Sequence, residues 1–205
     1  MLFLKKQNAF LPMTLSTASS DPADHAAPIL VKDRYFKPLL SKEAIAQRLA
    51  HLGKRIEADY QNDLPLFIGV LNGSFVFAAD LVRYIAIPCH FSFVKYASYQ
   101  DKMQSSGVVQ ELIGLNENLS NRRVVVIEDI VDTGNTMVKI LAYLREKGVE
   151  DVEIAALLVK PTALQHDISV KYVGFEIENQ FVVGYGLDYD GYGRNLDSLY
   201  VVSDL

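Results

Sequence analysis

Continuous apolar runs bounded by polar turns predict the buried strands of this chain. Such runs fall at residues 66–71, 124–127 and 152–159, the last with Glu153 as its polar exception, and strand patterns that include polar residues fall at 91–96 and 108–113. Strands that are covered on both faces of a parallel sheet read in this way, without the alternation of a half-exposed strand. We therefore expect one central, mostly parallel sheet of about five strands.

Apolar residues at helical spacing predict helices between these strands. Ser41 is a suitable N-cap, and the helix after it has one apolar face, formed by Ile45, Leu49, Leu52 and Ile56. Residues 75–84 and 137–144 predict two further helices. Because strands alternate with helices, we expect an α/β fold whose helices flank the sheet and whose ligands bind at the carboxyl ends of the strands.

Short strand patterns near the C-terminus, at residues 172–175, 181–184 and 199–202, predict a small C-terminal and N-terminal hood beside the main sheet. The chain has 205 residues, half of them hydrophobic, which suffices for one domain core. We place this single domain, hood included, at residues 29–205. Residues 1–28 read as a flexible N-terminal segment, because their second half is rich in Ser, Ala, Asp and Pro.

Composition narrows the class of partner. The formal net charge of -5 gives no basic footprint for nucleic acid, and no apolar run reaches the ~18 residues of a membrane span. The single cysteine, Cys89, excludes an internal disulfide and fits a reducing cytosol. The four histidines lack the spacing of metal ligands. We therefore expect a cytoplasmic protein that acts on small molecules, with neither nucleic acid nor membrane as partner.

Three signals meet after the apolar run 124–127. The run ends in Glu128 and Asp129, a polar loop with one glycine follows at 132–136, and a helix pattern comes next. Free N–H groups at such a helix start bind phosphate. The two carboxylates would repel a phosphate, so they fit ribose hydroxyls or a divalent cation instead. A sugar phosphate satisfies both halves, although the loop alone also fits an ordinary capped turn.

Taken whole, this stretch resembles the ribose-phosphate motif of the type I phosphoribosyltransferases. The resemblance implies that Glu128 and Asp129 hold the ribose diol of phosphoribosyl pyrophosphate. It also implies that the loop binds the 5-phosphate through Asp132, Thr133, Gly134, Asn135 and Thr136.

A second strand-to-turn junction narrows the resemblance to the hypoxanthine and hypoxanthine-guanine branch. There the turn Leu71, Asn72, Gly73 and Ser74 matches a pyrophosphate-binding loop that often contains a cis peptide. Many members carry Lys where this chain has Asn72. Backbone N–H groups are therefore expected to provide most of the pyrophosphate contacts.

The resemblance also implies how the base is bound. Lys160 follows the strand at 152–159 and matches the lysine that donates to the 6-oxygen of the purine, which selects oxopurines over adenine. Phe181 is expected to stack on the base. The remaining purine-binding positions are Ile130, Val182 and Asp188.

Three more roles follow from the same resemblance. Ser98 and Tyr99 match a mobile loop that closes over the donor and excludes water. Arg194 is the expected pyrophosphate clamp, and Asp132 the expected general base near the purine N7 atom. One or two Mg²⁺ ions are expected, with the ligands Glu128, Asp129 and Asp188.

The predicted reaction converts hypoxanthine, and guanine, with phosphoribosyl pyrophosphate into IMP or GMP and pyrophosphate, in a homodimer or homotetramer. A xanthine- or guanine-preferring transferase is the main alternative. An RNA-binding regulator on the same fold is another, which the acidic composition disfavours.

Overall fold

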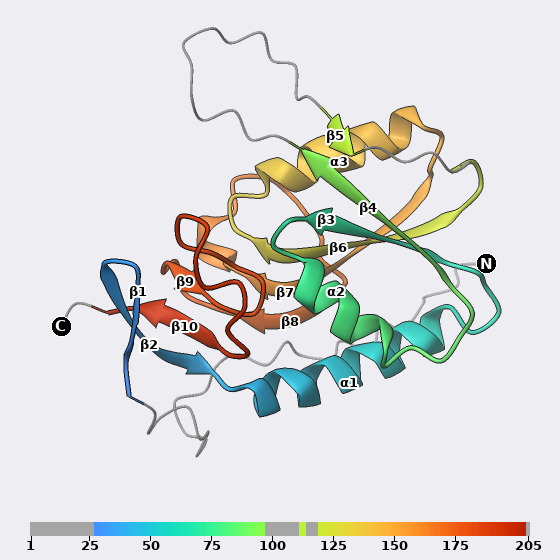
Figure 1. The fold of residues 1–205 in the computed structure, drawn as a ribbon. Coiled ribbons are helices and arrows are strands. Elements are labelled where there is room, and N and C mark those ends of the chain that lie inside the picture. The colour runs from blue at the N-terminus through green and yellow to red at the C-terminus, as the bar shows by residue number, and fades with distance from the viewer. Residues whose placement is uncertain (1–26, 97–110, 114–118, 204–205) are drawn as a thin grey trace, which may run out of the picture.

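A six-stranded sheet forms the centre of the protein, whose computed structural model describes residues 27–96, 111–113 and 119–203 (Figure 1). The strand order is β5-β4-β3-β6-β7-β8. The strands are β3 (Leu66–Leu71), β4 (His90–Tyr96), β5 (Glu111–Ile113), β6 (Arg123–Val131), β7 (Asp151–Val159) and β8 (Tyr172–Glu176). All neighbours pair in parallel except β5, which runs antiparallel to β4. The predicted α/β fold is therefore confirmed.

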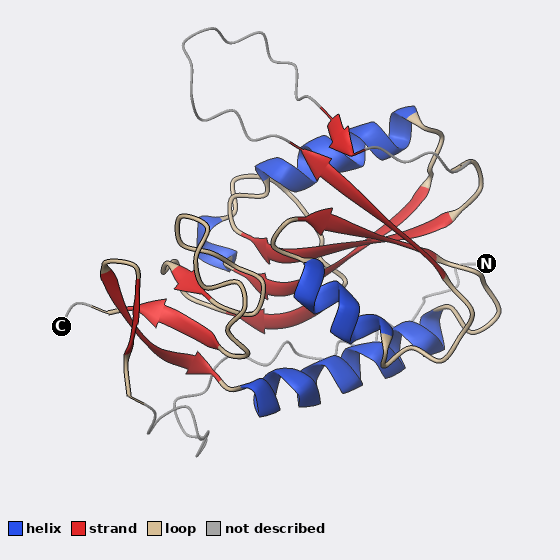
Figure 2. Cartoon of the chain, in the orientation of Figure 1, coloured by secondary structure: helices blue, strands red, loops and turns tan. Residues whose placement is uncertain are grey.

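Helices cover both faces of this sheet (Figure 2). They are α1 (Lys42–Asp59), α2 (Phe75–Val82) and α3 (Asn135–Glu146), and a 3-10 turn, η2 (Pro161–Ala163), follows β7. The predicted cap of α1 is present, since the Ser41 hydroxyl accepts a hydrogen bond from the Ala44 N–H at 3.2 Å. One core cluster joins α1 and α2 to the sheet and a second joins α3, so the helices lie on opposite faces. Among the described residues, no helix combines the length and the apolarity that a bilayer crossing requires.

A second, antiparallel sheet forms the hood, with the order β1-β2-β10-β9. Its strands are β1 (Ile29–Val31), β2 (Arg34–Leu40), β9 (Val182–Val183) and β10 (Leu199–Val202). The hood lies beyond the carboxyl ends of the parallel strands (Figure 1). One assignment was wrong: residues 172–175 belong to β8, which pairs with β7 in the main sheet and not in the hood.

Strand β6 also differs from its prediction, because it does not end at the acidic pair. Glu128 pairs with Ala156, and Val131 pairs with Val159 at the end of β7. The extra residues are held because β7 offers backbone partners along its whole length. The acidic pair therefore sits within the strand, and Glu128 is buried.

Candidate active site

A cleft of about 270 Å³ opens where β6 leads into α3, and its lining is the segment 128–137. The predicted ribose and 5-phosphate residues thus surround one space. Gly134 has a φ of 86°, in the left-handed region that favours glycine, and α3 begins at the next residue. The N-terminal N–H groups of α3 and its positive dipole end therefore lie beside this cleft.

The chain that follows η2 packs against this loop, a contact that the sequence pattern did not reveal. The Gln165 N–H donates to the Thr133 carbonyl at 3.0 Å. His166 Nε2 lies 2.6 Å from Asn135 Oδ1. A Cβ atom at Gly134 would meet Ile168 Cδ1, the movable end of a side chain, so the preference for glycine there comes from its positive φ. A lone histidine without partner spacing carries no sequence signal for such a role.

Glu128 and Asp129 occupy different environments although they are neighbours. The Glu128 side chain is buried, and within the described part of the chain its Oε2 atom has no hydrogen-bond partner. Burial, reinforced by the nearby Asp129 charge, raises the pKa of Glu128 well above its ordinary value of 4.5. Asp129 accepts a hydrogen bond from the Ile130 N–H at 2.9 Å. An unsatisfied carboxylate oxygen beside a cleft is suited to a hydroxyl donor or a cation.

The turn after β3 lies directly against Asp129. Its Leu71–Asn72 peptide bond is cis. A Cβ atom at Gly73 would overlap Asp129 Oδ2, so only glycine lets the turn approach the carboxylate. The Ser74 hydroxyl donates to the Val70 carbonyl at 2.6 Å and is buried. The turn therefore brings backbone, rather than the Ser74 hydroxyl, to the site.

Lys160 and Asp132 form an ion pair at the end of the sheet. Lys160 Nζ lies 2.6 Å from Asp132 Oδ2, and the lysine side chain is only 8% exposed. The Lys160 N–H also donates to the Val131 carbonyl at 3.0 Å, which ties the two strand ends together. The predicted base-reading cation and the predicted proton acceptor are thus adjacent.

The predicted pyrophosphate clamp contacts the predicted metal ligand of the C-terminal loop. Arg194 Nη2 lies 2.6 Å from Asp188 Oδ1, and Arg194 Nη1 donates to the Gly186 carbonyl at 2.8 Å. A Cβ atom at Gly186 would overlap the Gly73 carbonyl oxygen. This loop therefore packs on the turn after β3, next to the acidic pair.

Phe181 lies in the hood, apart from the residues that line the cleft. Its ring is 45% exposed and packs edge-on against Tyr189, with centroids 5.8 Å apart. The ring centroids of Phe36 and Phe181 lie 6.3 Å apart. Val182, the other hood residue expected at the base, is buried at 5% exposure. An exposed aromatic face at this end of the molecule is available for stacking.

A magnesium ion fits the donor set only if a substrate completes its coordination. Within the described residues, no group of three or more His, Cys, Asp or Glu side chains could hold a metal ion. Mg²⁺ is usually held by one or two carboxylates together with substrate phosphates and water. The carboxylates of Glu128, Asp129 and Asp188 are hard oxygen donors of that kind. The expected lid residues, Ser98 and Tyr99, lie outside the described residues.

Comparison with known proteins places these features in a family. A model of the phosphoribosyl transferase domain matches residues 37–190. The hypoxanthine-guanine phosphoribosyltransferase of Bacillus subtilis strain 168 is 37% identical over 167 residues, which are 82% of this chain and 93% of the relative. That of Mycobacterium tuberculosis strain H37Rv is 41% identical over 165 residues, with 77% and 81% covered. A crystal structure of hypoxanthine phosphoribosyltransferase from Staphylococcus aureus superposes with a TM-score of 0.76 at 37% identity, covering 82% of this chain and 91% of that one.

Proposed function

Since the chain belongs to the phosphoribosyltransferase family, in its hypoxanthine-guanine branch, we propose that it transfers the phosphoribosyl group of phosphoribosyl pyrophosphate to hypoxanthine and guanine. The products are IMP or GMP and pyrophosphate. The reaction is one of purine salvage, because it turns a free base into a nucleotide in one step.

The observation that carries the choice of base is the contact between Lys160 and Asp132, whose Nζ and Oδ2 atoms lie 2.6 Å apart. A 6-oxopurine presents an acceptor, O6, and a proton-bearing nitrogen, N7, side by side. The ammonium has three donors, so it can bind Asp132 and O6 together. Adenine would present an amino donor to the Lys160 donor, and the buried cation would then lose a partner.

Asp132 is the proposed general base. The purine N9 atom forms a bond to the anomeric carbon while the bond from that carbon to the pyrophosphate oxygen breaks, and pyrophosphate leaves with the electron pair. The proton on N7 passes to the Asp132 carboxylate. Holding N9 in line with the leaving oxygen supplies the orientation that such a displacement needs.

The sugar phosphate is proposed to bind along the segment 128–137. The N–H groups and hydroxyls of Thr133 and Thr136 surround the 5-phosphate at the positive end of α3. The ribose hydroxyls donate to Glu128 and Asp129, which satisfies the buried Oε2 atom of Glu128. Water is excluded from the reacting carbon once base and hood cover it, which limits hydrolysis of the donor.

Pyrophosphate is proposed to lie between the turn at 71–74 and Arg194. Asn72 carries no charge, so the leaving anion relies on backbone N–H groups and on the guanidinium. When bound, Mg²⁺ would neutralise part of the leaving group's charge, with Glu128, Asp129 and Asp188 as its protein ligands. Asp188 is available for this role once pyrophosphate competes for Arg194.

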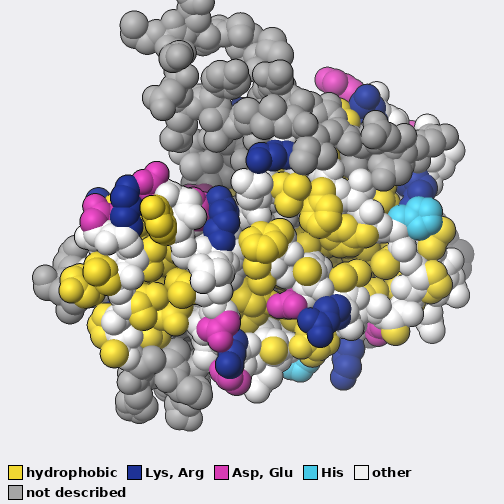
Figure 3. Space-filling model, viewed as in Figure 1, with side chains coloured by type: hydrophobic (Ala, Val, Ile, Leu, Met, Phe, Trp, Pro, Cys, Tyr) yellow, Lys and Arg dark blue, Asp and Glu magenta, His cyan; other side chains and the backbone are white. Residues whose placement is uncertain are grey.

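A homo-oligomer in the cytoplasm is proposed as the working form. Hydrophobic side chains gather over α2 and the strand beside it (Figure 3). Phe75 is 42% exposed there, and Phe91 and Phe93 are only partly buried. Such patches on small proteins mark contact surfaces. Light scattering after gel filtration distinguishes a dimer or tetramer from the 22.9 kDa monomer.

A panel of bases tests the proposed function. The protein is incubated with phosphoribosyl pyrophosphate, Mg²⁺ and hypoxanthine, guanine, xanthine or adenine in turn, and absorbance follows nucleotide formation. We expect IMP and GMP to form and AMP not to form. Turnover of adenine alone, or of no base, contradicts the proposal.

A further inference from the structure

We infer that Tyr185 is a positioning residue for the pyrophosphate side of the site, because it fixes the C-terminal loop that carries Asp188 and Arg194 onto α2. The inference rests on the proposed function, since it assumes that this loop meets pyrophosphate. Tyr185 itself is absent from the lining of the cleft at 128–137.

The backbone around Tyr185 is held in an unusual conformation. Gly184, Tyr185 and Gly186 have φ values of 104°, 47° and 102°, so three successive residues are left-handed. Glycine adopts such angles freely, but a tyrosine does so at a cost of roughly 1 kcal/mol or more. A non-glycine residue persists there only where its surroundings fix it. Here the Tyr185 N–H donates to the Leu196 carbonyl at 2.9 Å, and the side chain adds a hydrogen bond to Asp80 on α2.

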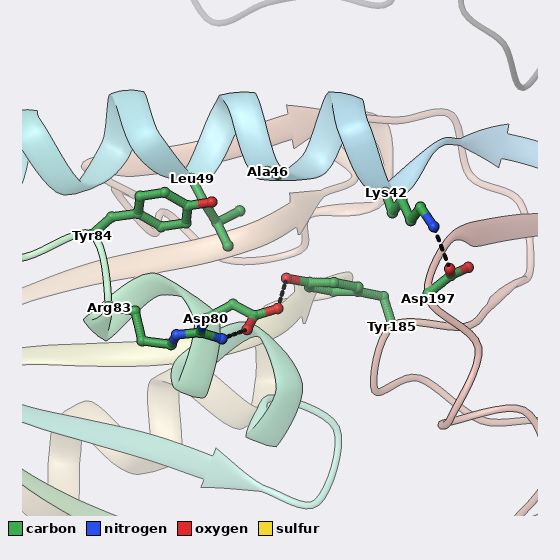
Figure 4. Close-up of a pocket in the computed structure, with 8 residues that line it drawn as sticks. All are labelled: Lys42, Ala46, Leu49, Asp80, Arg83, Tyr84, Tyr185 and Asp197. Carbon is green, nitrogen blue, oxygen red and sulfur yellow. Dashed lines mark hydrogen bonds and ion pairs between the residues drawn. The ribbon is translucent and has the colours of Figure 1, made fainter.

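The Tyr185 ring spans from the loop to α2 (Figure 4). Its hydroxyl donates to Asp80 Oδ2 at 2.6 Å, and the residue is only 6% exposed. Burial, together with Asp80, raises the pKa of the Tyr185 hydroxyl above its ordinary value of 10.0. The hydroxyl therefore stays protonated and remains a donor throughout the physiological range.

A continuous series of contacts leads from the hydrogen bond between Tyr185 and Asp80 to the proposed site. Gly186, next to Tyr185, packs on the Gly73 carbonyl. The Gly186 carbonyl accepts a hydrogen bond from Arg194 Nη1 at 2.8 Å. The Gly186 N–H donates back to the Arg194 carbonyl at 3.0 Å. Arg194 in turn contacts Asp188 at 2.6 Å. Movement of Tyr185 would therefore displace the guanidinium and the Asp188 carboxylate together.

The space beside the ring explains why the hydroxyl matters. A cavity of about 440 Å³ adjoins Tyr185, and its other walls include Ala46 and Leu49 of α1 and Tyr84 after α2. Side chains next to a cavity lose packing contacts on that side and can reorient. Without its bond to Asp80, the Tyr185 ring has room to turn into this cavity, which would release the loop.

Tyr185→Phe tests the inference, since it removes one oxygen atom and keeps the ring. In the full-length protein we expect the KM for pyrophosphate, measured in the reverse reaction with IMP, to rise about tenfold. The KM for phosphoribosyl pyrophosphate should rise similarly, while the KM for hypoxanthine changes less than about twofold. Asp80→Ala should reproduce this split, and Asp80→Asn, whose amide oxygen still accepts from the hydroxyl, should largely restore the wild-type constants.

Tyr84→Phe is the matched control, because Tyr84 lines the same cavity from the other side and is expected to leave all constants unchanged. Equal changes in all three KM values, or none, in Tyr185→Phe would overturn the inference. If that variant does not fold, Asp80→Ala decides by the same criterion. Wild-type protein that fails to convert hypoxanthine refutes the proposed function instead. Calorimetric titration of pyrophosphate into wild type and Tyr185→Phe then decides the inference separately, with equal affinity overturning it.

Discussion

Lys160 and Asp132 are adjacent charged residues with different proposed roles at the same edge of the purine base. Lys160 is almost fully covered, whereas the Asp132 side chain is 44% exposed and lies in the lining of the cleft. The cation therefore has a fixed position, and the carboxylate has access to a ligand. This asymmetry suits a selecting donor beside a proton acceptor.

Asp132→Asn should abolish proton acceptance while keeping the size of the side chain. We expect kcat to fall by about a hundredfold or more. Circular dichroism and the melting temperature check that the fold is retained, because Lys160 loses its charge partner. Asp33→Asn, at an exposed position in the turn between β1 and β2, is the control. If Asp132→Asn keeps kcat within about tenfold of wild type, Asp132 serves only as the ion-pair partner of Lys160 and is not the base.

The burial of Glu128 is expected to lower the stability of the fold while its carboxylate serves binding. Its pKa is raised in the folded protein, so the folded state holds the proton more tightly than the unfolded chain does. The free energy of unfolding therefore decreases as pH rises from the ordinary value of 4.5 through the folded pKa, and the full penalty applies above it.

Glu128→Gln removes that penalty. We expect its melting temperature to exceed that of wild type at pH about 8, with the difference shrinking towards pH about 4.5. Affinity for phosphoribosyl pyrophosphate should fall, because the carboxylate that accepts from ribose is gone. Glu150→Gln, an exposed control, should show neither effect. A melting temperature of Glu128→Gln equal to wild type at both pH values refutes this account of the burial.

A side chain of α1 provides hydrogen bonds to β8, the last strand of the main sheet. Arg48 Nε and Nη2 donate to the Gly174 and Val173 carbonyls, each at 2.7 Å. These bonds occupy acceptors of a strand at the edge of the sheet, which pairs with β7 and with no other strand among the described residues. Covering an edge in this way also protects it from pairing with another chain.

Arg48→Ala should therefore destabilise the fold by roughly 1.5 to 3 kcal/mol, the usual contribution of hydrogen bonds to a charged group. Urea unfolding followed by circular dichroism measures this loss. The neighbouring Gln47→Ala, on the exposed side of α1, should change stability by less than about 0.5 kcal/mol. Similar stability for both variants would show that Arg48 does not hold the edge.

The segment after η2 should affect binding of the 5-phosphate through His166. His166 occupies the Oδ1 atom of Asn135. The NH₂ group of the same amide then points away from His166, and a phosphate needs such a donor. His166→Ala should raise the KM for phosphoribosyl pyrophosphate about three- to tenfold and leave that for hypoxanthine unchanged. His166→Gln should recover most of the loss, and Ser169→Ala serves as control. An unchanged donor KM in His166→Ala removes His166 from the site.

The strands and helices were largely predictable because apolar runs and helical spacing are local patterns. Sheet membership was less so: the apolar pattern of residues 172–175 is the same in either sheet, and only its pairing with β7 places it. The same limit applies to the site. The segment 128–137 was visible as one motif, but Lys160 and Asp132 are 28 residues apart, and their contact depends on how β6 and β7 pair.

In the whole molecule, the proposed site and a network of ion pairs lie at opposite ends of the main sheet. The carboxyl ends of the strands face the hood and the proposed site (Figure 1). At the other end Arg123, the first residue of β6, bridges Asp63 at 2.5 Å and Asp151 at 2.7 Å, and its guanidinium lies 4.3 Å from the Tyr60 ring centroid. Such networks fix one end of a scaffold while loops at the other end respond to ligands.

A crystal structure of the protein with IMP and pyrophosphate would show the proposed contacts themselves. We expect the purine O6 atom within hydrogen-bond distance of Lys160 Nζ, N7 beside the Asp132 carboxylate, and the 5-phosphate on the N–H groups at 133–136. We also expect pyrophosphate between the turn at 71–74 and Arg194. A nucleotide bound elsewhere, or bound here with its O6 atom turned away from Lys160, would contradict the proposed function.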